Sequence, residues 1–132
     1  MKTNNNTMET AITINENLQH FHGSEVFYHI PLIRTHYTEG IHYLAQAADC
    51  FWLVTDASVI ARSLMGKSRF ITVDFKMHNE REREETGYAA SITYTDGNGL
   101  TFEVQRYHLT DFPLEKLRLF FVNGTLMLPS EY

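Results

Sequence analysis

The longest apolar-rich stretch, residues 38–65, constrains the fold more than any other part of this sequence. It contains the only tryptophan, Trp52, and its apolar residues recur at the spacing of a helix. One apolar stripe runs along one face of the expected helix over most of the stretch. A second apolar stripe lies on another face and is confined to the later half. A helix that is apolar on two faces lies between layers of a fold. We therefore expect the later half to be buried at the centre, with Trp52 packed against a sheet.

This stretch is too long to form one straight helix inside a small domain. At 1.5 Å per residue it would extend roughly 40 Å, whereas a domain of 132 residues is about 36 Å across. We therefore expect a bend or a split, either near residues 49–50 or near residues 55–58. Thr38 is a suitable N-cap residue, and Gly66 is expected to end the helix.

After Gly66 the apolar residues alternate with polar ones, which is typical of half-buried strands. This alternation predicts strands at residues 71–77, 88–95 and 100–108. The sequence Asp96-Gly97-Asn98-Gly99 is a strong turn signal between the last two of these strands.

The end of the chain, residues 117–128, can be read in two ways. It is either a hairpin around Asn123-Gly124 or a helix followed by a strand, and its β-branched and aromatic residues favour the hairpin. One helical turn is expected just before it, at residues 113–116. The predicted class is α+β, in which N-terminal helices and the central buried helix pack on an antiparallel meander of about five strands.

The N-terminal residues 1–14 are polar and are expected to form a flexible segment, which leaves residues 15–132 as a single α+β domain. Asn15 is expected to cap a short helix that ends before Gly23. Two short extended pieces are expected on either side of Pro31, namely residues 26–29 and 33–37.

Composition and charge favour a soluble, cytoplasmic protein. The chain contains one cysteine, has no apolar run long enough to span a membrane, and begins with a polar segment unlike a signal peptide. The net charge of −5 argues against nucleic acid as the main partner, although residues 62–76 are locally basic.

Seven histidines, five of them between residues 20 and 42, form the first candidate for chemistry. A metal site built from His20, His22 and Glu25 is conceivable, but no paired metal-binding motif supports it. We therefore expect no metal, no cofactor and no catalytic residue. A small enzyme or metal-binding protein that uses residues 20–42 is the alternative.

Cys50 is the second candidate, because a thiolate is a strong nucleophile. It precedes a run of apolar residues inside the expected helix, so we expect it to be buried and inert. A helix break at Asp49 would reverse this expectation, since a helix N-terminus lowers the pKa of a thiol.

Two surfaces are candidates for binding other proteins. The first is an alternating charged segment, expected to be a solvated hairpin arm that contacts a partner: Glu80, Arg81, Glu82, Arg83, Glu84 and Glu85. The second is the C-terminal hairpin, which has few charges and would form an exposed sheet edge through Phe121, Leu126 and Met127. Such an edge favours a two-fold homodimer, and a monomer stays open as the other outcome.

The ending FPLEKLRLFFVNGTLMLPSEY, the entry YTEG to the central helix and the apolar FWL in its middle also carry a resemblance. The chain, from about residue 15 to its end, resembles a family of short, functionally uncharacterised bacterial proteins that also occurs on plasmids and in phages. The resemblance supplies no catalytic residues, and residues 78–86 are peculiar to this chain. It implies an accessory protein of a mobile element or phage. We therefore expect a non-catalytic protein-interaction module that binds a host or defence protein.

Overall fold

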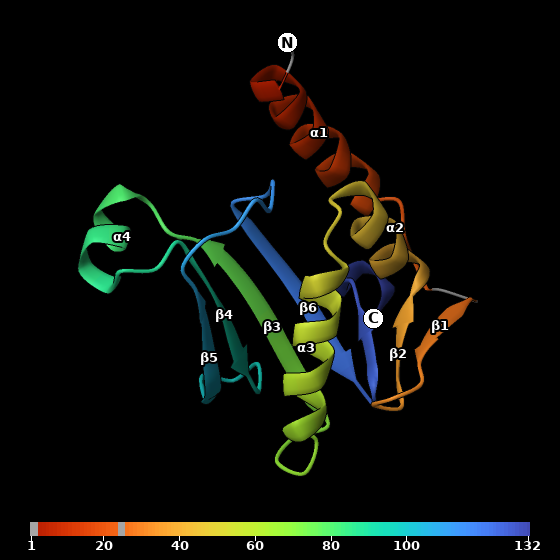
Figure 1. The fold of residues 1–132 in the computed structure, drawn as a ribbon. Helices are drawn as coiled ribbons and strands as arrows, with labels where there is room; N and C mark the ends of the chain where they lie inside the picture. The colour runs from red at the N-terminus through yellow and green to blue at the C-terminus, as the bar shows by residue number, and fades with distance from the viewer. Residues whose placement is uncertain (1–2, 24–25) are drawn as a thin grey trace.

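A seven-stranded sheet with two helices, α2 and α3, on one of its faces forms the body of the protein (Figure 1). The computed structural model describes the backbone of residues 3–23 and 26–132 and the side chains of residues 11–23 and 26–132. Within these residues the elements are α1 (Thr3–Leu18), β1 (Phe27–Ile30), β2 (Thr35–Thr38), α2 (Glu39–Ala47), α3 (Phe51–Ser63), β3 (Phe70–Met77), α4 (Glu80–Thr86), β4 (Ala90–Thr95), β5 (Thr101–Tyr107), β6 (Lys116–Val122), β7 (Thr125–Met127) and the 3-10 turn η1 (Pro129–Glu131). The α+β class is confirmed.

The strands lie in the order β1-β2-β7-β6-β3-β4-β5, and every neighbouring pair is antiparallel except β2 with β7. The described sheet is therefore larger than the predicted meander, because β1 and β2 join it beside β7. These two strands correspond to the short extended pieces expected around Pro31. No helix within the described residues is both long and apolar enough to cross a membrane.

The C-terminal hairpin is confirmed, since β6 and β7 pair around Asn123 and Gly124, both of which have positive φ. The helical turn expected before it is wrong, because residues 113–115 are irregular and Lys116 already belongs to β6. Phe112 and Leu114 are both buried, at 3% and 2% exposure. An extended backbone points residues two apart to the same side, whereas a helical turn would separate them.

The interpretation of this hairpin as an exposed edge is wrong. The β2 strand pairs with β7, so both hairpin strands lie inside the sheet. Phe121 and Leu126 are fully buried in the hydrophobic core, and Met127 is half-buried. These residues are therefore not available as a dimer edge. The homodimer itself stays a prediction.

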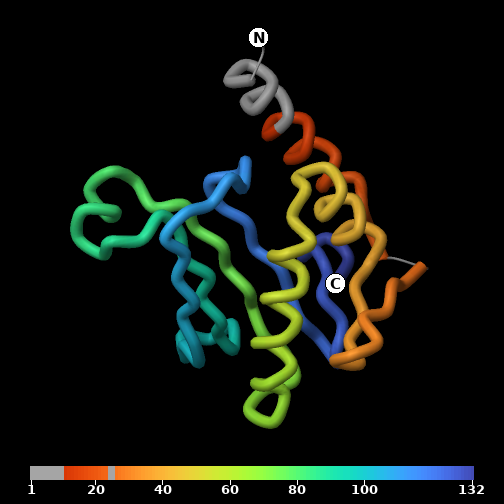
Figure 2. Tube along the Cα trace, viewed as in Figure 1, coloured from red at the N-terminus to blue at the C-terminus, as the bar shows by residue number. Residues whose placement is uncertain are grey.

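The central helix is split near residues 49–50, the first of the two positions expected from the sequence. Helix α2 ends at Ala47, Asp49 adopts a positive φ of 49°, and α3 starts at Phe51. The trace turns at this point before it runs along the sheet as α3 (Figure 2). Thr38 caps α2, as predicted, by accepting a hydrogen bond from the backbone N–H of Ile41. Trp52 is partly buried, and its ring contacts Tyr107 and Phe112 edge to face.

Helix α1 begins at Thr3, so the short helix expected to start at Asn15 is the end of a longer one. Ile14 and Leu18 belong to the core, which ties this end of α1 to the body of the fold. Whether residues 1–14 move as a flexible segment stays a prediction. Residues 1–2, Ser24 and Glu25 lie outside the described residues.

Candidate interaction surface

A short helix, α4, interrupts the connection between β3 and β4 and projects to one side of the sheet (Figure 1). It was expected as a hairpin arm, and that part of the prediction is wrong. Asn79 and Glu82 form a capping box: the Glu82 N–H donates to Asn79 Oδ1 at 2.8 Å, and the Asn79 N–H donates to Glu82 Oε1 at 2.9 Å. Asn followed three residues later by Glu was the sequence signal for this helix. Residues 79–87 are called the α4 arm below.

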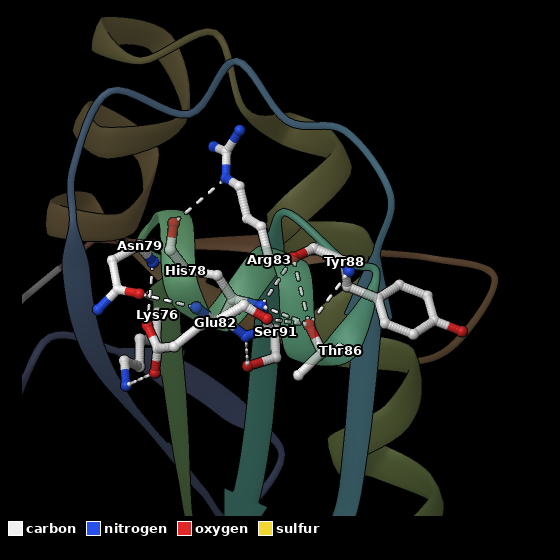
Figure 3. A network of polar contacts seen from close by, with 8 residues as sticks. All are labelled: Lys76, His78, Asn79, Glu82, Arg83, Thr86, Tyr88 and Ser91. Carbon is white, nitrogen blue, oxygen red and sulfur yellow. Dashed lines mark hydrogen bonds and ion pairs between the residues drawn. The ribbon is translucent and has the colours of Figure 1, made fainter.

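The base of the α4 arm is fastened to the sheet by polar contacts (Figure 3). Lys76 Nζ, on β3, lies 2.5 Å from Glu82 Oε2, and this contact is the main cause of the lowered pKa of Glu82. The His78 ring bridges two groups, with Nδ1 2.8 Å from the Tyr88 carbonyl and Nε2 3.2 Å from Ser91 Oγ. Arg83 Nε donates to the His78 carbonyl at 3.3 Å. These contacts hold the arm in one position.

The outward side of the arm is charged and exposed. Glu80, Arg81, Arg83, Glu84 and Glu85 are all exposed, so the arm presents three carboxylates and two guanidinium groups to solvent. The pair Arg81–Glu85 is 3.7 Å apart between highly exposed side chains, and a pair of this kind contributes little to stability. Of the six residues predicted to bind a partner, Glu82 and Arg83 therefore hold the arm in place, and the other four are available for contacts.

A row of cationic residues crosses the sheet beside the arm, on the face opposite to α3. Arg106, Ser91, Lys76 and Lys116 lie directly across from one another on β5, β4, β3 and β6. The adjacent pair Lys76 and Lys116 places like charges opposite each other, which is unfavourable by on the order of a few tenths of a kcal/mol. We call Arg106, Lys76 and Lys116 the cationic row.

Carboxylates compensate only part of this positive charge. Lys76 is paired with Glu82, and the neighbouring Arg118 makes two hydrogen bonds of 2.7 and 3.0 Å to Asp74. Within the described residues no carboxylate pairs with Lys116 or Arg106. Arg106 instead lies over the ring of Tyr88, 5.9 Å from its centre.

Two shallow hollows meet at the cationic row. One, of about 380 Å³, is lined by residues of β3 and β6 only, and the other, of about 350 Å³, extends from these strands to the α4 arm. Lys76 and Lys116 line both hollows. The row and the arm therefore border one continuous hollowed surface.

The histidines of residues 20–42 do not converge. His20 and His22 follow α1, His29 and His36 form a tilted pair across β1 and β2 with ring centres 4.8 Å apart, and His42 stacks on Tyr28. In the described part of the chain no three His, Cys, Asp or Glu side chains gather at metal-binding distances. Glu25 lies outside this part, so the conceivable site of His20, His22 and Glu25 is not tested, and the expectation that the chain binds no metal stays a prediction.

Cys50 does lie at a new helix N-terminus, because the helix breaks beside it. It is nevertheless fully buried, and its Sγ lies 3.6 Å from the Leu44 carbonyl. Burial raises the pKa of the Cys50 thiol to about 12, and the carboxylates of Asp49 and Asp111 add to this rise. Desolvation therefore outweighs the favourable field of the helix end, and the thiol stays protonated.

One contact that sequence reasoning missed joins the two segments that carry the family resemblance. The buried Glu131 carboxylate accepts hydrogen bonds from Thr38 Oγ1 at 2.6 Å, the Gly40 N–H at 3.1 Å and the Leu128 N–H at 3.0 Å. A Cβ at Gly40 would lie 2.5 Å from Leu128 Cδ1. The YTEG and LPSEY segments thus meet at the start of α2. This contact serves the fold and is separate from the α4 arm.

Residues 12–132 match a family of unknown function, DUF6876, and the chain belongs to this family. This result confirms the resemblance to a family without an assigned activity. Neither the curated proteins nor the solved structures include one that is significantly similar to the chain.

Proposed function

We propose that this member of the DUF6876 family is a non-catalytic protein-interaction module, and that the α4 arm is its contact element. One observation supports this proposal: α4 contributes no buried residue, yet it is held by a capping box and an ion pair. Polar contacts of this kind add little to global stability. They do fix the arm before it meets a partner, which reduces the conformational entropy lost on binding.

The partner that we propose is a host or defence protein, and the proposed setting is the bacterial cytoplasm. The resemblance to proteins of plasmids and phages supports the setting, and the single cysteine supports a reducing compartment. The three outward carboxylates of the arm favour a partner surface that presents basic side chains.

Site-specific photo-crosslinking tests this proposal. A photoreactive phenylalanine analogue replaces Glu84 on the exposed side of the arm, and the same analogue replaces Arg62, exposed near the end of α3, as the matched control. Both chains are expressed in the bacterial host and irradiated. We expect crosslinks from position 84 to a host protein and no such product from position 62.

Crosslinked products are identified by mass spectrometry. Equal crosslinking of the same proteins from both positions, or no crosslinked product at position 84, would refute the arm as the contact element. A product that contains only two copies of this chain would argue for self-association instead.

A further inference from the structure

We infer that the cationic row receives the α4 arm of a second copy of this chain, so that two copies form a two-fold dimer. This inference rests on the proposed role of the arm as a contact element, and it names a partner for that element. It does not use the dimer edge predicted from the sequence, because Phe121 and Leu126 are buried and Met127 is half-buried.

The charges of this surface are complementary to each other but are not paired within one chain. On the row, Lys116 and Arg106 have no carboxylate partner among the described residues, and Lys76 faces Lys116 directly. On the arm, Glu80 and Glu84 form no ion pair within the described residues, and Glu85 has only the long contact to Arg81. Each set of charges therefore lacks the partner that the other set would provide.

The two sets are also neighbours, because Lys76 of the row binds Glu82 at the base of the arm. A two-fold axis brings the same patch of both copies together, so that each residue contact is made twice. A patch with an acidic part beside a basic part is complementary to itself under this operation. The arm of each copy would then lie over the row of the other, and the hollows at Lys76 and Lys116 provide room for its side chains.

Nucleic acid fits this surface less well than a second copy does. A phosphate backbone that follows the row towards the arm would meet the exposed carboxylates of Glu80 and Glu84. The arm of a second copy presents carboxylates to the row and presents its own row to the first arm. The surface as a whole therefore favours the second copy.

A dimer held by exposed charges should be sensitive to salt. Screening shortens the range of charge interactions from about 14 Å in 0.05 M salt to about 4 Å in 0.5 M salt. Light scattering of the full chain over a concentration series should give a mass approaching two chains at the lower salt concentration. At the higher salt concentration, we expect the mass to approach that of one chain.

Charge reversal makes the test specific. The row variant R106E/K116E and the arm variant E80K/E84K/E85K should each be monomeric, because like charges would then face each other across the axis. An equimolar mixture of the two variants should dimerise, since each acidic arm would meet a basic row and each basic arm an acidic row. The single variant K116E, which keeps Arg106 on Tyr88, should weaken self-association about fivefold.

The control R62E/K67E reverses two exposed cations outside this surface and should dimerise like the unmodified chain. Circular dichroism verifies that each variant is folded. A wild-type mass of one chain at low salt, or a mixture that stays monomeric, would overturn the inference. Light scattering tests the dimer, and photo-crosslinking from position 84 tests the contact with a host protein. The inference of a dimer can therefore fail while the proposed function survives.

Discussion

Gly40 depends on a contact with Glu131, which lies 91 residues further along the chain. Its N–H donates to the Glu131 carboxylate, and the space for a Cβ is occupied by the Leu128 and Glu131 side chains. Thr38 completes this site from the position that caps α2. The start of α2 and the end of the chain therefore stabilise each other.

Replacing Gly40 with alanine should lower the free energy of unfolding by about 2 kcal/mol, because the new methyl group forces the C-terminal turn away from α2. Urea denaturation measures this change. The matched control is Gly66→Ala, where nothing lies within 4 Å of the added Cβ. If the two variants are equally stable, the contact at Glu131 does not hold the C-terminus in place.

Cys50 should be unreactive in the folded protein. Because burial raises its pKa to about 12, the thiolate is scarce at neutral pH, and alkylation by iodoacetamide should be slow until urea unfolds the chain. The unfolded thiol ionises near its usual pKa of 9.0 and the folded thiol does not. Stability should therefore fall as pH rises from 9.0 towards about 12. Rapid alkylation of the folded chain at neutral pH would contradict this account.

At the scale of elements, local patterns predicted most of the fold. The split between α2 and α3 followed from the length of an unbroken helix, and the alternation of apolar residues marked β3, β4 and β5. The pairing of β2 with β7 had no local signal, because it joins in parallel two short segments that lie far apart in the sequence. This pairing also explains why the hairpin was misplaced at an edge.

The α4 arm can be removed without opening the sheet. The His78 N–H donates to the Ala89 carbonyl at 2.8 Å, so β3 and β4 are already close at the base of the arm. Replacing residues 79–88, which are the arm and the half-buried Tyr88, with Asn-Gly should connect the strands by a two-residue turn. Since α4 has no buried residue, we expect the free energy of unfolding to change by no more than about 1 kcal/mol.

Urea denaturation of this shortened chain tests that expectation. The control is Asp96→Asn in the turn between β4 and β5, where the amide oxygen can still accept from the Asn98 and Leu100 N–H groups. Loss of cooperative unfolding in the arm-deleted chain alone would mean that the arm is needed for folding. The polar contacts of the arm would then be explained by its role in folding, and they would no longer support a role in binding.

At the scale of the whole molecule, the net charge of −5 conceals a basic row beside an acidic arm. The sequence identified the charged segment 80–85 as a contact candidate, but it did not reveal which of its residues hold the arm in place. The cationic row was not predictable from sequence, because Lys76, Arg106 and Lys116 become neighbours only through the register of β3, β4, β5 and β6. The basic segment 62–76 contributes only Lys76 to this row.

We propose that the chain acts through contacts made by the α4 arm. The most direct measurement is quantitative mass spectrometry of host proteins captured by the immobilised full chain and by the folded arm-deleted chain, side by side. We expect at least one host protein to bind the full chain and the R62E/K67E control, and to be lost from the arm-deleted chain. Capture of the same host proteins in the same amounts by the full and the arm-deleted chains would contradict it.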